Sequence, residues 1–238
     1  TTISHLRFGP QPIKSTYYID KADFVACHAS SFISKYDILK DLKPGGFFLL
    51  NSDINEKNVE DLLPNKIKKV LAEKNINFYI LNATEISREL GLGGRVNTAL
   101  QAAFFKIINI FEPHKALSLI KAAIFNSYGK KGENVVEINN LCAEEGMKRL
   151  IKIIVPDNWK YLPIKNEFTD FKYENDKLKN YVENVALPIN KKEGNQLPVS
   201  AFLPYVDGSV PLGSVAYEKR STASFVPSWK PENCIECN

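Results

Sequence analysis

The chain has 238 residues, of which 44% are hydrophobic and 24% charged, with a formal net charge of +4. This length accommodates one large or two modest domains with a buried core. There is no basic stripe interleaved with aromatic residues, no apolar run near the roughly 18 residues of a membrane span, and too few cysteines for a disulfide framework, so neither nucleic acid nor membrane is an expected partner.

The first third of the chain predicts strands alternating with helices. Residues 1–7 alternate loosely and fit a short strand, and a strand at the first residue suggests that the chain starts inside a domain. Ser30 or Ser31 is expected to cap a helix that ends near Leu42, and Pro44-Gly45-Gly46 to end that unit. Pro64 is expected to start a second helix, and Thr84 to cap a short helix that stops at Gly91. Apolar runs of the buried-strand type lie at 23–27, 47–50 and 76–81. This alternation predicts an α/β fold with an open, mostly parallel sheet flanked by helices.

The segment 90–111 combines a glycine-rich turn with an apolar helix. Gly94 is the last of three turn glycines that permit left-handed backbone angles, Arg95 follows, and Asn97 or Thr98 is expected to cap the helix. A glycine turn, an arginine and a helix N-terminus together form a plausible anion site. The alternative is a tight turn before a core helix, and from these residues alone it is the favoured interpretation.

Two further helices are expected, followed by a change of composition. The helices span about 113–127 and 134–149, and their apolar faces are expected to include Leu117, Ile120 and Ile124, and Val135, Ile138 and Leu141. After Val155 prolines recur and helical periodicity almost disappears, although the segment stays too apolar for simple disorder. We therefore expect an extended proline-rich arm with little regular structure that packs on something larger.

Two other groups of residues carry possible chemistry. Arg7 and Lys14 flank a glycine–proline kink, which could hold a phosphate or a buried acidic partner, and the residues leave this choice open. Cys234 and Cys237 form a C-x-x-C pair, which brings two thiolates within reach of one metal or cluster. Two ligands do not complete a site, and the alternative is a tail with two free thiols. No nucleophile-elbow, metalloprotease or dinucleotide-binding motif is present.

Three long stretches in this order resemble the pyruvate:ferredoxin (flavodoxin) oxidoreductase family: SHLRFGPQPIKSTYYI with DFVACH, GLGGRVNTALQAAFFKI, and LPVSAFLPYVDGSVPLGSVAYEKRS with the final VPSWKPENCIECN. The resemblance covers nearly the whole chain. It implies a division into four parts: a partial gamma-type, coenzyme A-binding domain (1–155), a linker (156–195), a segment named for Glu218-Lys219-Arg220 (196–230) and the truncated start of a ferredoxin-like domain (231–238).

The resemblance further implies that the chain is a fragment of a large enzyme and has no activity alone. The parent would oxidise pyruvate with coenzyme A to acetyl-CoA and CO₂, using thiamine diphosphate, Mg²⁺ and 4Fe–4S clusters, and would pass electrons to ferredoxin, flavodoxin or, in a fused relative, NADP. Arg7, Lys14, Gly94, Arg95 and Asn97 are the expected coenzyme A contacts, and Cys234 and Cys237 the first two cluster ligands. The remaining domains are the expected partners, in a cytoplasmic homodimeric parent. The rival hypothesis is a purely structural interdomain module.

Overall fold

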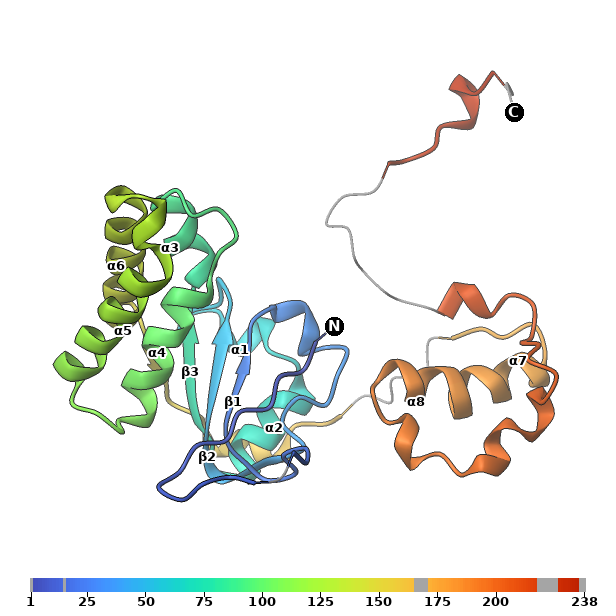
Figure 1. The fold of residues 1–238 in the computed structure, drawn as a ribbon. Helices are drawn as coiled ribbons and strands as arrows, with labels where there is room; N and C mark the ends of the chain where they lie inside the picture. The colour runs from blue at the N-terminus through green and yellow to red at the C-terminus, as the bar shows by residue number, and fades with distance from the viewer. Residues whose placement is uncertain (1, 15, 165–170, 218–226, 236–238) are drawn as a thin grey trace. The chain divides into compact units, whose positions relative to one another are not determined.

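The structure, a computed structural model, describes residues 2–14, 16–164, 171–217 and 227–235 (Figure 1). The chain divides into two compact units, Thr1–Lys165 and Asn166–Asn238. The first unit contains the sheet and its helices, and the second contains a short helical stretch followed by irregular chain. None of the helices in the described part of the chain is long and apolar enough to cross a membrane.

A four-stranded sheet forms the centre of the first unit. Its strands are β1 (Ala22–Cys27), β2 (Leu42–Asn51), β3 (Asn77–Leu81) and β4 (Ile151–Ile153), and their spatial order is also β1-β2-β3-β4. The first three strands are parallel, and β4 runs antiparallel to β3. The predicted open and mostly parallel sheet is confirmed by these strand directions, and two helices form the crossover between β2 and β3.

One face of the sheet is covered by α1 (Val59–Leu62), α2 (Asn65–Glu73) and the 3₁₀ helix η3 (Asp157–Tyr161). Phe48 and Phe78 stack on neighbouring strands with ring centroids 5.4 Å apart, and Trp159 of η3 is fully buried in the same cluster. Burial of these large apolar side chains fixes η3, although it lies far along the chain from α2.

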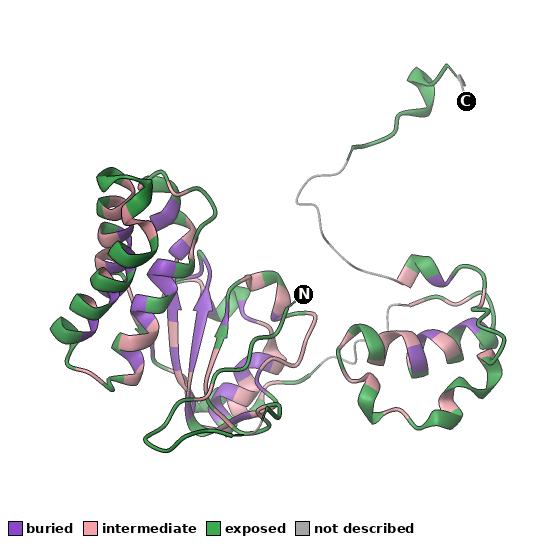
Figure 2. Ribbon diagram, viewed as in Figure 1, coloured by how far each residue is buried: buried purple, intermediate pink, exposed green. Residues whose placement is uncertain are grey.

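The other face is covered by α3 (Ala83–Glu89), α4 (Asn97–Ile108) and α6 (Glu133–Lys148). The remaining helix, α5 (Pro113–Tyr128), packs on α4 and α6 through a separate cluster that includes Ile120, Ile124 and Met147. In Figure 2 buried residues line the inner sides of these helices, while much of α5 is exposed. The helices predicted at 113–127 and 134–149 are confirmed within about one residue.

The predicted helix after β1 is wrong. Only Ser30–Phe32 forms a single 3₁₀ turn, and the chain then turns irregularly to Leu42, where β2 begins. The ammonium group of Lys74 explains the turns, because it donates to the carbonyls of Leu39, Lys40 and Leu42 at 2.8–3.0 Å. Backbone carbonyls that accept from a lysine side chain are satisfied without the backbone hydrogen bonds of a helix.

The strand predicted at 47–50 begins five residues earlier. Pro44, Gly45 and Gly46 lie inside β2 instead of ending the preceding unit, and the register with β1 shifts between Ala22 and Phe24. Gly45 has a φ of 73°, so the strand absorbs the irregularity as a local bulge.

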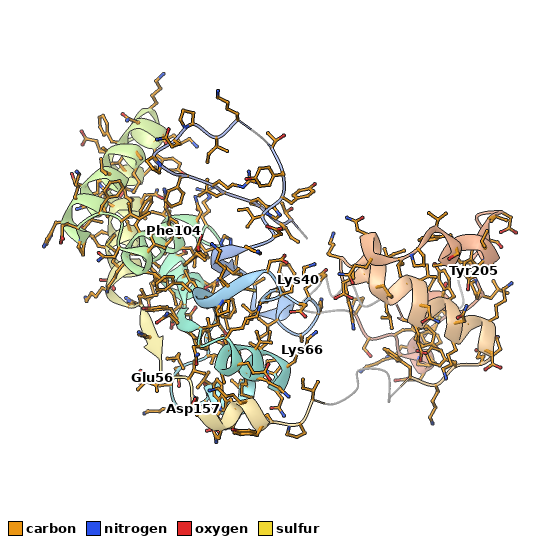
Figure 3. The ribbon with its side chains drawn as sticks, turned by 90° about the horizontal axis from the view of Figure 1, so that it is seen from below. Lys40, Glu56, Lys66, Phe104, Asp157 and Tyr205 are labelled. Atoms are coloured by element: carbon orange, nitrogen blue, oxygen red, sulfur yellow. The ribbon has the colours of Figure 1, made fainter. Side chains whose placement is uncertain are left out.

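The strand predicted at residues 1–7 is also absent, since residues 2–20 contain no regular element among the described positions. Side chains hold this segment instead: the Ile19 amide donates to Nδ1 of His5 at 3.0 Å, and the Arg7 guanidinium lies 3.5 Å from the centre of the Tyr17 ring. The Phe8 ring contacts Phe104 of α4, which is labelled in Figure 3. These contacts replace a backbone ladder.

Two details of the helices differ from the prediction. Asn82, and not Thr84, caps α3, because its side chain accepts from the Glu85 amide at 3.0 Å. In α6 Leu141 is 41% exposed, whereas Cys142, Ala143 and Gly146 are buried. Small residues let α4 approach α6 closely, so close backbone packing overrides the hydrophobicity of Leu141.

The second unit contains one helical stretch composed of α7 (Asp176–Tyr181), the π-helical turn Val182–Ala186 and α8 (Leu187–Asn190). Leu178, Val182 and Val185 are its buried residues. This stretch lies within the segment expected to be a linker. Beyond Asn190 only 3₁₀ turns occur among the described residues, as predicted for the proline-rich arm. Glu218, Lys219 and Arg220 lie outside the described residues.

Candidate functional site

The turn between α3 and α4 closes through its own backbone. The Leu92 amide donates to the Ser87 carbonyl at 2.7 Å, and the Arg95 amide donates to the Leu92 carbonyl at 3.3 Å. Gly91 and Gly93 have φ angles of 74° and 63°, which L side chains rarely adopt, so glycine is required at both positions. The glycines therefore shape a tight turn, as both interpretations of this sequence predicted.

The N-terminus of α4 has no side-chain cap. Its N-cap residue is Val96, and neither Asn97 nor Thr98 caps the helix as predicted. The reason lies in Thr98, which is buried and donates its hydroxyl hydrogen to Oδ1 of Asn139 on α6 at 3.1 Å. The backbone N–H groups of the first helical turn thus have no side-chain acceptor, and no capping side chain neutralises the positive end of the helix dipole.

Arg95 lies next to this helix end with its side chain exposed and without an ion pair in the described part of the chain. A hydrogen bond holds the carbonyl oxygen of Arg95 in place, because the buried hydroxyl of Ser87 donates to it at 3.0 Å. A Cβ atom added at Gly94 would meet nothing within 4 Å, so there is open space beside the turn. The backbone at Arg95 is therefore held in place while its guanidinium is free to reach a ligand.

A second exposed arginine, Arg88, was missed in the sequence analysis. It lies in the last turn of α3, and its carbonyl accepts from the Gly91 amide at 3.1 Å, so it borders the same turn. The neighbouring acidic residue, Glu89, pairs with Arg149 at 2.7 Å. The sequence did contain a signal for this residue, because Arg88 and Arg95 lie on either side of the turn glycines. Together these charges favour an anion at this turn.

The structure does not bring Arg7 and Lys14 to the α3–α4 turn. Arg7 is half-buried against Tyr17, and its neighbour Phe8 contacts Phe104, which lies about 10 Å along α4 from Asn97. Lys14 is exposed. Of the five expected coenzyme A contacts, only Gly94, Arg95 and Asn97 are grouped together.

A buried asparagine joins the carboxyl ends of the three parallel strands. The amide nitrogen of Asn51 donates to the His28 carbonyl at 2.9 Å and to Thr84 Oγ1 at 3.1 Å, and its Oδ1 accepts from the Ala83 amide at 2.9 Å. Sequence analysis missed this residue, because an asparagine after a strand resembles any polar turn. Ligands of open α/β sheets bind near this edge, so Asn51 fixes the elements that would surround one.

The cysteines differ in exposure. Burial raises the pKa of the Cys27 thiol to about 11, and burial likewise raises the pKa of Cys142. These two thiols are therefore inert at neutral pH. Cys234 is exposed, and Cys237 lies outside the described residues. No group of three metal-ligating side chains occurs among the residues described.

The fold and the turn define an α/β unit with an exposed, positively charged helix N-terminus beside its sheet. Residues 1–149 match the family described as pyruvate ferredoxin/flavodoxin oxidoreductase, and residues 171–223 match a family described only as a domain of unknown function. The chain therefore belongs to the pyruvate ferredoxin/flavodoxin oxidoreductase family.

Three relatives illustrate this membership. The chain is 44% identical to a pyruvate-flavodoxin oxidoreductase of Klebsiella pneumoniae and 42% identical to a pyruvate:ferredoxin oxidoreductase of Moorella thermoacetica, and each match covers 100% of this chain. It is 38% identical, again over 100% of its length, to a pyruvate dehydrogenase [NADP(+)] of Cryptosporidium parvum. The chain spans only 20% of each of the first two relatives and 13% of the third.

Proposed function

We propose that this chain works as part of a pyruvate oxidoreductase, which converts pyruvate and coenzyme A to acetyl-CoA and CO₂. The names of the relatives support the oxidation of pyruvate, and they leave ferredoxin, flavodoxin and NADP as alternative electron acceptors. Thiamine diphosphate, Mg²⁺ and most cluster ligands would belong to the remaining domains of a cytoplasmic, homodimeric parent. Cys234 and Cys237 would supply two thiolates to a 4Fe–4S cluster, which would carry electrons to the acceptor.

Within that enzyme, the first unit would bind the phosphates of coenzyme A at the turn before α4. The observation that carries this proposal is the uncapped N-terminus of α4 beside the exposed Arg95. Backbone N–H groups and a guanidinium are suitable donors for phosphate oxygens, and Arg88 would add a second positive charge. Arg7 and Lys14 could contribute to this ligand only at a separate point of contact.

The test is the substitution Arg95→Ala in the parent enzyme. A charge-assisted bond contributes about 1.5–3 kcal/mol, so the apparent KM for coenzyme A should rise roughly tenfold to hundredfold while the KM for pyruvate changes little. Lys21→Ala, an exposed lysine at the amino end of β1, is the control and should alter neither constant. An equal rise in both constants together with a lower melting temperature would instead identify Arg95 as a packing residue.

A second role is interdomain packing, and one observation favours it. The N-terminal segment exposes several large apolar side chains, including Ile3 (63%), Leu6 (69%) and Tyr18 (82%). Such side chains usually lie at an interface when they are grouped on one segment. A titration separates the two roles, because coenzyme A should bind only if the turn before α4 is a ligand site.

A further inference from the structure

One face of α5 is exposed and uncharged over more than two helical turns. We call it the α5 outer face and define it by Ser118, Leu119, Ala122, Ala123 and Asn126, all exposed. Leu119, Ala122, Ala123 and Asn126 follow the i, i+3, i+4, i+7 spacing of a single helical face, and Ser118 borders that face. Helix α5 turns its opposite face, with Ile120 and Ile124, towards α4 and α6. The solvent-exposed face of a helix normally carries charged side chains, and the α5 outer face carries none.

A hollow lies beside the α5 outer face. It has a volume of about 200 Å³ and is lined mainly by apolar side chains of α4, α5 and the segment between them, among them Phe105, Phe111 and Leu119. Leu119 is 49% exposed at its rim, and Phe125 on the other border of the face is 65% exposed. The hollow could admit one large apolar side chain, and the two alanines would let a second helix approach closely.

The charged residues of α5 and the turn after it are lysines, and the acidic side chain paired with one of them, Glu144, belongs to α6. No aspartate or glutamate occurs between Glu112 and Glu133. Lys115 lies at one end of the face, and Lys130 and Lys131 follow the other end, all three exposed. Lys121 is already paired with Glu144 of α6 at 2.5 Å. A partner with acidic residues at both ends of an apolar ridge would therefore match the surface in charge as well as in polarity.

We propose that the α5 outer face binds an amphipathic helix, with an apolar ridge flanked by acidic residues, from the part of the parent enzyme outside these 238 residues. This inference rests on the proposal that the chain acts within a longer enzyme. The relatives support a partner of this origin, because the chain spans only 20% of the Klebsiella and Moorella enzymes. One large side chain of that helix fills the hollow, and its ridge covers Ala122 and Ala123.

Hydroxyl-radical labelling of side chains tests this surface by comparing the 238-residue chain with the parent enzyme. Leu119 and Phe125 should be labelled readily in the isolated chain and at least fivefold more slowly in the parent, while buried Ile120 stays unlabelled in both. Cross-linking from Lys115 and Lys131 should reach acidic residues of one helix elsewhere in the parent. Equal labelling in both samples, protection that appears in the isolated chain as its concentration rises, or cross-links only to a second copy would overturn the proposal.

A pair of substitutions sharpens the test. Ala123→Glu should restore labelling of Leu119 in the parent while leaving the melting temperature of the isolated chain nearly unchanged, because Ala123 is exposed there. Asn134→Glu, at an exposed position of α6, is the control and should leave Leu119 protected. Continued protection in the Ala123→Glu parent would contradict the assignment. The KM for coenzyme A tests the phosphate site independently, so the two proposals can fail separately.

Discussion

Asn51 shows how much one side chain contributes to the edge of the sheet where the parallel strands end. Its three hydrogen bonds connect the chain after β1, the end of β2 and the start of α3, and the residue is 6% exposed. An aspartate could not reproduce them, since an ionised carboxylate only accepts. The amide therefore suits this position because it both donates and accepts.

Asn51→Ala should lower the free energy of unfolding by about 2–3 kcal/mol, because it leaves the Ala83 amide and the His28 carbonyl without their partner. For a chain of this size the melting temperature should fall by roughly 5–10 °C. Asn126→Ala, at an exposed position of α5, is the control and should change it by only a degree or two. Thermal unfolding of the 238-residue chain measures both, and matching melting temperatures would show that water replaces the lost bonds.

At the scale of elements, α4 and α6 cross in close backbone contact. A Cβ atom added at Gly146 would lie 2.5 Å from the Ala99 carbonyl oxygen and 2.7 Å from its Cα. These are backbone atoms, which cannot move aside as a flexible side chain can. Gly146 is therefore needed for space, since its own backbone angles are helical.

Gly146→Ala should separate α4 from α6 and destabilise the chain by about 1–3 kcal/mol, although alanine favours a helix more than glycine does. Gly9→Ala, where the added atom meets nothing within 4 Å, provides the matched control. Chemical denaturation of both variants measures the difference. A more stable Gly146→Ala chain would mean that propensity outweighs the steric conflict and that the helices can shift apart without loss.

The elements that could be predicted from sequence are those whose local pattern and tertiary packing favour the same structure. Both favour the observed structure in the helices α2, α5 and α6 and in the core of β3. The failures have long-range causes that local pattern cannot reveal. Lys74 bonds the carbonyls of the segment before β2, and Asn139 binds Thr98 from another helix. At the candidate site the turn and Arg95 were predictable, whereas the uncapped helix end and Asn51 depend on contacts between distant residues.

At the scale of the whole molecule, apolar burial is distributed unequally between the two units. Among the residues that the structure describes, the three clusters of buried apolar residues all belong to the first unit, from Cys27 to Trp159. In the described part of the second unit the buried apolar residues are Leu178, Val182 and Val185. The rings of Tyr181 and Tyr205 add an aromatic contact, with their centroids 5.0 Å apart. So small a core gives little stability by itself.

The fragment Thr1–Lys165 should therefore fold alone and melt within a few degrees of the 238-residue chain, because its core is complete without the second unit. The fragment Asn166–Asn238 should show no cooperative transition by circular dichroism, since its few buried side chains scarcely offset the conformational entropy of ordering the chain. Calorimetry of the 238-residue chain should then give one transition with the enthalpy of the first fragment. A second cooperative transition would show that the second unit has a sufficient core of its own, and loss of folding in Thr1–Lys165 would show that the first unit needs residues beyond Lys165.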